Sequence, residues 1–331
     1  MIASNKKEYF ISIVIPTFNV EKTIENAFNS IFKQTIGFEN LEIIFVDDAS
    51  KDETRNKILE YSKNFENVKS IILSNNSGFP GKPRNIGMKH STAKYIMFLD
   101  ADDEYFLDAC EILYNKIKLE KCNIISGNFL QIKNNKEHLK KWDFLNIENR
   151  ELKIGTISEK LELFYIAPSV WTKIYDKEFL LRNNIYFIED LPAEDLIFVS
   201  EALINAKSII FLDKPVLYYI ERDYSTNSQK AISDDNTKEQ LSNYLKAYEI
   251  TYNLVKDYFF NEEPIFIFYH LIYWFKLLNN SDLNLKTKFE LLNESLPLFK
   301  RFKDVEKNMN TTDKKIKECI LNKRFEELLE N

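Results

Sequence analysis

The stretch "FLDADDEYF" at residues 98–106 sets four carboxylates directly behind an apolar run, "YIMFL" at 95–99. The carboxylates belong to Asp100, Asp102, Asp103 and Glu104. An apolar run of this length that ends on polar residues predicts a buried strand of a parallel sheet. The acidic cluster would then lie at the carboxyl end of the strand, where open α/β sheets bind their ligands.

The rest of the first half alternates short apolar runs with helical spacing. The runs are "ISIVI" at 11–15, "LEIIFV" at 41–46, "VKSIIL" at 68–73 and "CNIIS" at 122–126. Between them, apolar residues recur every three or four positions over 21–34, 52–64, 84–91 and 106–120. This order predicts an α/β fold with a Rossmann-like, mostly parallel sheet that carries helices on its faces.

The second half of the chain mixes helices and strands and then turns helical. A capping box, Thr156 with Glu159, predicts the start of a helix. Helical spacing predicts further helices over 176–183 and 194–206, and strand-like runs follow at 208–213 and 215–221.

From residue 236 onward only helices are expected. The run at 264–275 is apolar all round, which suits a helix buried in a small bundle or between the subunits of a homo-oligomer. We therefore expect two α/β halves, at 1–110 and 111–228, and a helical C-terminal domain at 229–331.

Composition limits the classes of partner. A net charge of −6 argues against a protein that coats nucleic acid. The cysteines, Cys110, Cys122 and Cys319, have no spacing that fits a disulfide framework or a zinc site. No apolar stretch reaches the roughly 20 residues that span a bilayer. We expect a cytoplasmic protein that works in solution or peripherally at the inner face of the membrane.

Two common nucleotide-binding motifs are absent from the sequence. No G-x-G-x-x-G follows a predicted strand, and Gly81-Lys82 is followed by Pro83 where a phosphate-binding loop needs Ser or Thr. These absences exclude a dehydrogenase of the dinucleotide-binding type and a P-loop NTPase.

The pair Asp100-x-Asp102 has two readings. Carboxylates are favourable near a helix N-terminus, so the pair can simply complement a helix dipole. Alternatively, one or two carboxylates hold Mg²⁺ or Mn²⁺ while water and phosphate oxygens complete the coordination. Asp47 and Asp48, expected at the same sheet edge, can accept hydrogen bonds from a base or a ribose, which favours the metal and a nucleoside diphosphate.

The stretch "GKPRNIG" at 81–87 adds positive charge to this edge. Pro83 suits the first turn of a helix, and Lys82 and Arg84 would stand at the positive end of that helix. A nucleoside, a diphosphate with its metal and a cationic helix start would then share one crevice.

Five motifs in order resemble those of family 2 of the glycosyltransferases, whose catalytic domain has the GT-A fold. They are "ISIVIPTFNVEKTIENAFNSIFKQT", "FVDDASKDET", "NSGFPGKPRNIG", "KYIMFLDADD" and "PAEDLIF". The resemblance covers residues 10–220. The helical remainder is similar, more loosely, to accessory regions of enzymes that decorate wall teichoic acids or build capsules.

This resemblance implies a role for the residues at each strand end. Uridine would be bound by Pro16, Thr17, Phe18, Asn19 and either Asp47 or Asp48. Asn76 and Arg84 would lie near the base and the diphosphate. In the D-x-D motif, Asp100 would lie near the ribose with Ala101 beside it, and Asp102 would bind Mn²⁺ or Mg²⁺.

The resemblance also implies a catalytic base, Asp195 in "PAEDLIF". A carboxylate near the anomeric carbon can take the proton from an acceptor hydroxyl as it attacks from the face opposite UDP, which inverts the configuration. The alternative is that Glu194 and Asp195 only cap the helix that follows.

Five weaker candidates for substrate contact remain: Lys82, Asp103, Trp171, Glu194 and Arg222. Trp171 would stack on the sugar, although a core position explains an aromatic side chain equally simply. Arg222 would clamp the diphosphate, with an ordinary surface charge as the alternative.

Together these features predict an inverting, metal-dependent glycosyltransferase. It would move N-acetylglucosamine or another hexose from a UDP-sugar to a hydroxyl of a bacterial surface polymer, with a teichoic-acid-like polyol phosphate favoured. Alternative acceptors are a capsular polysaccharide, an exopolysaccharide or a lipid-linked glycan. A nucleotidyltransferase is disfavoured because no Gly-rich triphosphate loop is present. A noncatalytic scaffold of the GT-A type is disfavoured by the intact Asp100, Asp102 and Asp195.

Overall fold

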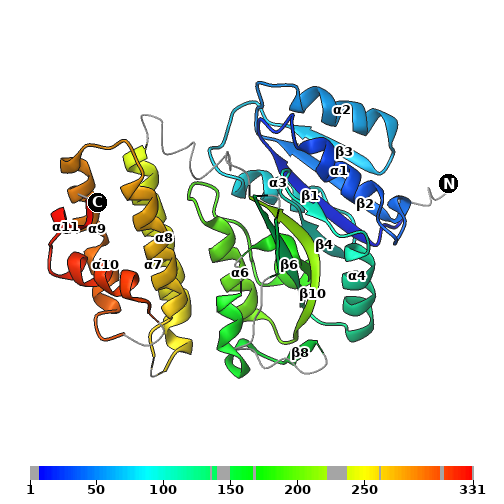
Figure 1. The fold of residues 1–331 in the computed structure, drawn as a ribbon. Helices are drawn as coiled ribbons and strands as arrows, with labels where there is room; N and C mark the ends of the chain where they lie inside the picture. Colours follow the sequence, from blue (N-terminus) through cyan, green and yellow to red (C-terminus); the bar gives the residue numbers. More distant parts are fainter. Residues whose placement is uncertain are drawn as a thin grey trace. The chain divides into compact units, whose positions relative to one another are not determined.

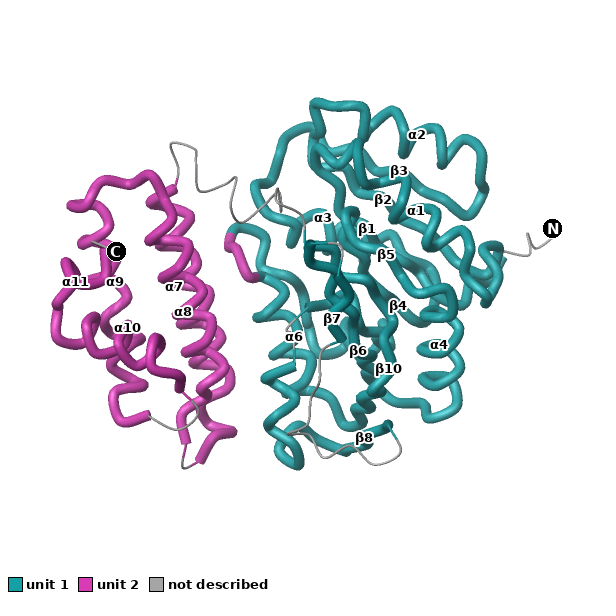
Figure 2. The backbone as a smooth tube through the Cα atoms, in the orientation of Figure 1, with its two compact units in different colours: residues 1–190, 194–221 teal, residues 191–193, 222–331 magenta. Residues whose placement is uncertain are grey.

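The computed structural model describes residues 7–134, 136–139, 150–166, 169–221, 237–260, 262–305 and 309–329. The chain forms two compact units, one of residues 1–190 and 194–221 and one of residues 191–193 and 222–331 (Figure 2). The first unit is an α/β sheet structure, and the second is helical (Figure 1).

The first unit is built on a mixed sheet whose first half is parallel. Strands β3 (Val68–Ile72), β2 (Leu41–Asp47), β1 (Ile11–Thr17) and β4 (Tyr95–Phe98) run parallel in this order. Strand β9 (Lys173–Asp176) then runs antiparallel between β4 and β6 (Ile124–Lys133). Beyond β6 the order continues with β10 (Ile209–Ile220) and β5 (Glu104–Tyr105). Two short strands, β7 (Lys136–Leu139) and β8 (Glu151–Ile154), pair with β6 and β10. The expected α/β class with a mixed, mostly parallel core is confirmed.

Helices cover both faces of this sheet. On one face, α1 (Ile24–Phe32), α2 (Thr54–Asn64) and α4 (Ala109–Glu120) bury their apolar sides against a cluster that includes alternate residues of β1. On the other face lie α3 (Gly81–His90) and α6 (Glu194–Asn205), and the short helix α5 (Lys177–Arg182) follows β9. The alternation of side chains along β1 decides which residue meets which layer, since Ile13 faces the first cluster and Val14 faces α3.

Three local details differ from the expectations. The capping box of Thr156 and Glu159 is present, but it starts only a 3₁₀ turn, Ile157–Glu159, and not an α-helix. The runs at 208–213 and 215–221 join into the single strand β10, whose register against β6 is irregular around Pro215. Strand β9 was not expected at all, because its four residues are too few to show a periodic pattern.

The second unit is a helical bundle. Its helices are α7 (Thr237–Val255), α8 (Ile265–Asn279), α9 (Leu285–Arg301), α10 (Thr311–Leu321) and α11 (Glu326–Leu329). Trp274 of α8 is fully buried and donates its indole N–H to the carbonyl of Leu241, at 2.8 Å. The apolar run at 264–275 therefore packs into the core of the bundle. Across the described ranges, no helix is both long and apolar enough to cross a bilayer.

Helix α3 approaches β1 closely because it has no side chain at Gly87. A Cβ atom at this position would lie 2.3 Å from Cγ1 of Val14. Val14 is fully buried and cannot move aside without disturbing the core. Gly87 therefore sets the depth of α3, the helix that presents Arg84 to the sheet edge.

We predict that Gly87→Ala destabilises the protein, although Gly to Ala inside a helix normally stabilises by about 1 kcal/mol. Overpacking against Val14 should cost about 1–3 kcal/mol instead, measured by urea unfolding. The double variant Gly87→Ala/Val14→Ala should recover part of this loss relative to the sum of the single changes. Strict additivity would show that the two side chains do not compete for the same space.

Candidate active site

The residues predicted to form the site lie mainly at one edge of the sheet. The parallel strands β1, β2 and β4 end there at Thr17, Asp47 and Phe98. Strand β9 is antiparallel to β4, with Met97 opposite Ile174, so its first residue, Lys173, reaches the same edge. The D-x-D motif and Lys173 thus come together from distant parts of the sequence.

The loops after β1 and β2 are joined by polar contacts around Asp47. This carboxylate is fully buried and accepts from the backbone N–H of Ser50 at 3.1 Å and from the Ser50 hydroxyl. The same hydroxyl accepts the N–H of Asn19 at 3.0 Å, and the Asn19 side chain accepts the N–H of Lys51 at 2.8 Å. Asn19 itself has a φ of 52°, a left-handed conformation that Asn tolerates well. Asp47 therefore organises the two loops.

Asp48 fixes the third loop of the edge. Its carboxylate accepts the backbone N–H and the hydroxyl of Ser77 at 2.9 Å and the side-chain N–H of Asn76 at 3.1 Å. Burial raises the pKa of Asp48, and the hydrogen bonds from Ser77 oppose that rise. Asn76 remains exposed beside it. Both aspartates thus hold the loops of a cradle, which we define as residues 16–19, 47–51 and 76–77.

The aspartates of the D-x-D motif, Asp100 and Asp102, and the adjacent Asp103 have different environments. Asp103 is 2% exposed, and its carboxylate accepts the backbone N–H of Ile220 at 3.1 Å. Asp100 is paired with Arg84, at 2.6 Å between Oδ1 and Nη2. Asp102 lies between them and is half-buried. The backbone carbonyl of Ala101 accepts the hydroxyl of Thr23 at 2.9 Å, which ties the motif to the loop after β1.

The donor set at this point fits a hard divalent cation that also binds a diphosphate. Among the described residues, no three His, Cys, Asp or Glu side chains cluster as a complete protein-built metal site. Mg²⁺ needs only one or two carboxylates when phosphate oxygens and water supply the other ligands. Asp102, which is half-buried on the same loop, is the side chain that would hold such an ion, as the resemblance to family 2 implies.

Arg84 is buried between two carboxylates. Its Nη2 binds Asp100, its Nη1 forms an ion pair with Glu194, and the side chain is only 4% exposed. The guanidinium carbon lies 5.4 Å from the centroid of the Phe187 ring. Burial acts against the charge of Arg84, but Asp100, Glu194 and Asp195 raise its pKa, so the guanidinium stays charged. The sequence predicted that Arg84 lies near the diphosphate, and the structure directs both of its terminal nitrogens to protein carboxylates.

Glu194 and Asp195 begin helix α6. Burial raises the pKa of both carboxyl groups above their ordinary values, while the positive charge of Arg84 opposes the rise in each. The carboxylate of Asp195 accepts the backbone N–H of Leu196 at 2.8 Å and is half-buried. A carboxylate with a raised pKa is a better proton acceptor than an ordinary surface aspartate, which suits the role of a general base.

Lys173 and Tyr175 of β9 interact electrostatically with Asp195 and were missed by the sequence analysis. Lys173 is buried and donates to the carbonyl of Ser169 at 2.7 Å and to the hydroxyl of Thr172 at 3.3 Å. Burial lowers the pKa of Lys173 to about 7, and the charge of Asp195 opposes this shift. Tyr175 is fully buried, and Asp195 helps to raise its pKa well above the usual value, after burial itself. Only the pairing of β9 with β4 reveals that these residues belong here.

The remaining predicted residues occupy varied positions. Pro16 is half-buried, whereas Phe18 and Lys82 are exposed, the latter at the start of α3. Trp171 is 8% exposed, because it stacks on Tyr219 and meets Phe129 edge-on. This packing suits a core residue, so we leave Trp171 out of the donor site. Arg222 lies outside the described residues.

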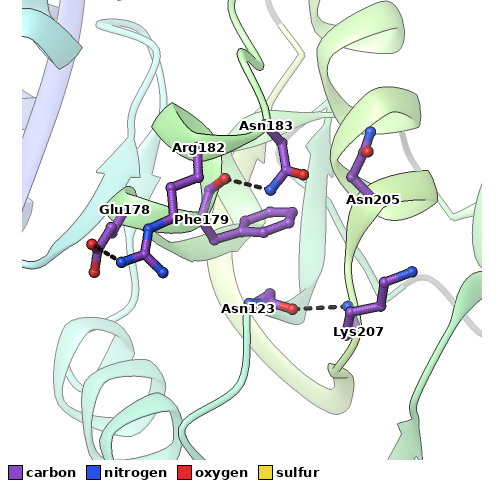
Figure 3. A pocket seen from close by; sticks show the side chains of 7 residues that line it. All are labelled: Asn123, Glu178, Phe179, Arg182, Asn183, Asn205 and Lys207. Atoms are coloured by element: carbon purple, nitrogen blue, oxygen red, sulfur yellow. Dashed lines mark hydrogen bonds and ion pairs between the residues drawn. The ribbon is translucent and has the colours of Figure 1, made fainter.

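Two surface cavities lie away from this edge. One of about 310 Å³ is lined by polar side chains at the amino ends of β6 and β10, among them Asn123, Asn183 and Lys207 (Figure 3). In it, Asn123 accepts the backbone N–H of Lys207 and Asn183 donates to the carbonyl of Phe179, so the amides serve the local backbone. The other, of about 730 Å³, lies along α3 and α5. Neither cavity is lined by the D-x-D motif or by Asp195.

Comparison with known families identifies the α/β unit. Residues 12–174 match the model of glycosyl transferase family 2. The chain is 32% identical over 239 residues to the poly(ribitol-phosphate) beta-N-acetylglucosaminyltransferase TarS of Staphylococcus aureus, an alignment that covers 70% of this chain and 39% of the relative. It is 31% identical to a poly(ribitol-phosphate) beta-glucosyltransferase of Bacillus spizizenii, with coverage of 72% and 36%. The chain thus spans less than half the length of these two relatives.

A solved structure supports the fold. The crystal structure of residues 1–349 of Staphylococcus aureus TarS in complex with UDP-GlcNAc matches with a TM-score of 0.65 and 24% identity. The match covers 88% of this chain and 80% of that one. At this level of identity the likeness confirms the GT-A-like fold with its helical C-terminal region.

We predict that the stability contributed by Lys173 depends on pH. Its pKa is about 7 in the folded protein and about 10.4 when unfolded, so between these values only the unfolded chain holds the proton. Stability should therefore rise with pH across this window relative to Lys173→Met, by on the order of 2 kcal/mol between pH 7 and pH 9. Urea unfolding of both proteins at the two pH values measures this difference.

The matched control is Lys89→Met, a change at an exposed lysine of α3. Its effect on unfolding should be the same at pH 7 and pH 9. An equal effect of Lys173→Met at both pH values would mean that the Lys173 amine keeps its proton through this range.

Proposed function

Because residues 12–174 of this chain form a glycosyl transferase family 2 domain, we propose that the protein transfers a sugar from a UDP-sugar to a hydroxyl of a poly(ribitol phosphate)-like teichoic acid. The observation that carries this proposal is the contact of one buried guanidinium, Arg84, with carboxylates from both halves of the site. Asp100 belongs to the strand end that would face the diphosphate, and Glu194 precedes the candidate base, Asp195. The loop that would face the diphosphate and the candidate base, Asp195, are therefore held at one edge of the sheet.

The donor would lie across the cradle at the ends of β1 and β2. Its loops are fixed by internal hydrogen bonds of Asp47 and Asp48 before any ligand arrives, which lowers the cost of ordering them on binding. Asn19, Asn76 and the ring of Phe18 are exposed at the surface of the cradle, where a uracil and a ribose would lie. This arrangement supports a nucleoside site without requiring an enclosed cavity.

A divalent cation, Mn²⁺ or Mg²⁺, would bind Asp102. When bound, such an ion offsets the negative charge that develops on the leaving diphosphate. The protein supplies the other requirements: Asp100 and Asp103 are kept in place by Arg84 and by the backbone of Ile220, so the loop that carries Asp102 is fixed on both sides. The exposed Lys82 at the start of α3 adds a positive charge near the same loops.

Asp195 would take the proton from the acceptor hydroxyl. Its position at the start of α6, its partial burial and its raised pKa suit a general base. A single displacement inverts the anomeric configuration, so an α-linked UDP-sugar would give a β-linked product. The two poly(ribitol-phosphate) transferases named above are both called beta-transferases, which agrees with this stereochemistry.

The relatives also guide the choice of substrates. N-acetylglucosamine is our first choice of sugar and glucose the second, in line with their names. We propose that residues 1–110 bind the nucleotide sugar and that 111–228 contribute the acceptor side, since β9 and α6 bring Lys173 and Asp195 to the edge. We further propose that the protein works in the cytoplasm, where a UDP-sugar donor is at hand.

We predict that Asp195→Asn lowers kcat for UDP release by about 10²–10⁴-fold, the usual contribution of a general base. The amide keeps the shape of the side chain but cannot take the proton. UDP release is measured across a panel of UDP-sugars with Mn²⁺ or Mg²⁺ and purified poly(ribitol phosphate). The matched control, Asp190→Asn at an exposed aspartate of the preceding loop, should behave like the wild type.

Three results would count against the proposal. Near wild-type turnover by Asp195→Asn would remove Asp195 as the base. UDP release that responds to a lipid-linked glycan and not to poly(ribitol phosphate) would replace the acceptor, and no UDP binding by calorimetry would favour a noncatalytic scaffold.

We predict separately that Asp102→Ala abolishes the dependence of turnover on the metal ion. Titration of Mn²⁺ should stimulate the wild type and leave this variant at the level seen with a chelator. A circular dichroism melt checks that the variant is folded at the assay temperature. A normal metal response in Asp102→Ala would place the ion elsewhere.

A further inference from the structure

Arg84 connects two elements that are far apart in sequence. Its ion pair with Asp100 reaches the end of β4, and its ion pair with Glu194 reaches the first residue of α6. Asp102 lies two residues beyond the first contact, and Asp195 lies one residue beyond the second. One side chain therefore stands between the candidate ion ligand and the candidate base.

The contacts of Arg84 are those of a structural group rather than of a ligand-binding one. Both terminal nitrogens bind protein carboxylates, and the Arg84 and Glu194 side chains are 4% and 6% exposed. Breaking one side of such a buried pair leaves an uncompensated charge, which is costly. With a side chain only 4% exposed, the guanidinium offers little surface to a diphosphate.

Helix α3 holds Arg84 in this place through two further contacts with the segment before α6. Asn85 donates to the carbonyl of Phe187 at 2.8 Å and accepts its N–H at 2.9 Å. A Cβ atom at Gly81 would lie 2.1 Å from the carbonyl oxygen of Ile188 and 3.3 Å from Cγ of Glu194, so only glycine permits this close approach. The first turns of α3 thus form a rigid base for the start of α6.

The start of α6 carries backbone strain that its contacts with the rest of the unit must offset. Ala193, directly before the helix, has a φ of 54°, a conformation that a residue other than glycine adopts only at a cost. The Asp195 side chain bonds only the neighbouring N–H of Leu196 among the contacts described for it. Glu194 ties the first residue of the helix to Arg84, and Phe198 then packs edge-on against Phe98 and Tyr175.

We infer that Arg84 and Glu194 are positioning residues of the transfer reaction. Arg84 clamps the first turn of α6 to the end of β4 and so fixes Asp195 relative to Asp102, without touching the substrate. The inference rests on the proposed function for the roles of Asp102 and Asp195. The clamp itself is a statement about the structure and can be tested without turnover.

Loss of the clamp should change kcat more than substrate binding. A shift of the base by about 1 Å can cost 10²-fold in rate, so we expect Arg84→Lys to lower kcat by about that factor. Lysine keeps the charge but has no fork with which to bind two carboxylates. The KM for the UDP-sugar and the affinity for UDP should stay within about threefold of the wild type, because the cradle is untouched.

A conservative substitution at Glu194 tests the positioning role a second time. Glu194→Gln keeps an oxygen that accepts from Arg84 and should retain clearly more activity than Glu194→Ala, which leaves Arg84 with one partner. If Glu194 is itself the proton acceptor or binds the sugar through its charge, Glu194→Gln will be as inactive as Asp195→Asn. That result would overturn the positioning role.

Hydrogen–deuterium exchange of the full chain provides the readout that does not depend on activity. Arg84→Lys should raise exchange in the first turn of α6, residues 194–198, while exchange in β1 stays the same. The matched control is Arg182→Lys, which alters an exposed i,i+4 ion pair with Glu178 and should change neither exchange in α6 nor turnover. A circular dichroism melt checks that each variant is folded at the assay temperature.

The outcomes separate the two proposals. Unchanged exchange in α6 of Arg84→Lys overturns the clamp. A UDP affinity that falls more than about tenfold in this variant also overturns it and assigns Arg84 to the diphosphate. If the wild type releases no UDP from any donor, the proposed function fails and exchange alone decides on the clamp. If Arg84→Lys does not fold, exchange and turnover of Glu194→Gln against Glu194→Ala decide it.

Discussion

The carboxylates at the carboxyl edge of the sheet repel one another, and the structure of the site follows from how that repulsion is offset. Parallel strands bring Asp47, Asp48 and the D-x-D motif to one edge, and α6 adds Glu194 and Asp195. Like charges at short range raise one another's pKa and favour protonation or separation. Each carboxylate therefore needs hydrogen-bond donors or a cation, and the donors available decide its role.

Buried charged groups of the α/β unit are satisfied by hydrogen bonds to different degrees. At the opposite edge, Glu42 is fully buried and accepts from Lys69 at 2.6 Å, from the hydroxyl of Ser12, and from the backbone and hydroxyl of Thr92 at 2.7 and 2.8 Å. A carboxylate satisfied this completely is a structural group. Around Arg84 the satisfaction is incomplete: the two buried side-chain polar atoms without a partner in the described part of the chain are Arg84 Nε and the Tyr175 hydroxyl. Buried polar groups left unpaired are costly, and they are typical of sites kept for function rather than stability.

The sequence pattern predicted that Asp100 and Asp102 lie at the carboxyl end of a strand, because they directly follow an apolar run. Asp195 was proposed only through the resemblance to family 2, since its local pattern equally fits a helix cap. Lys173 gave no such signal, since β9 is four residues long and reaches the edge with its first residue only because it runs antiparallel. The burial of Arg84 was equally hidden, because Glu194, its second partner, lies 110 residues away.

The three aspartates after β4, Asp100, Asp102 and Asp103, therefore have different roles. Asp103 is buried and fixes its loop to the backbone of β10 through Ile220, and Asp100 neutralises a buried arginine. Asp102 is half-buried between these two anchored neighbours, where we propose that a cation and a diphosphate reach it. Two of the aspartates thus supply the rigidity that the third requires, because a ligand carboxylate loses less entropy on binding when its loop is already ordered. The high density of carboxylates at residues 100–104 therefore reflects these separate roles more than it reflects the number of ions bound.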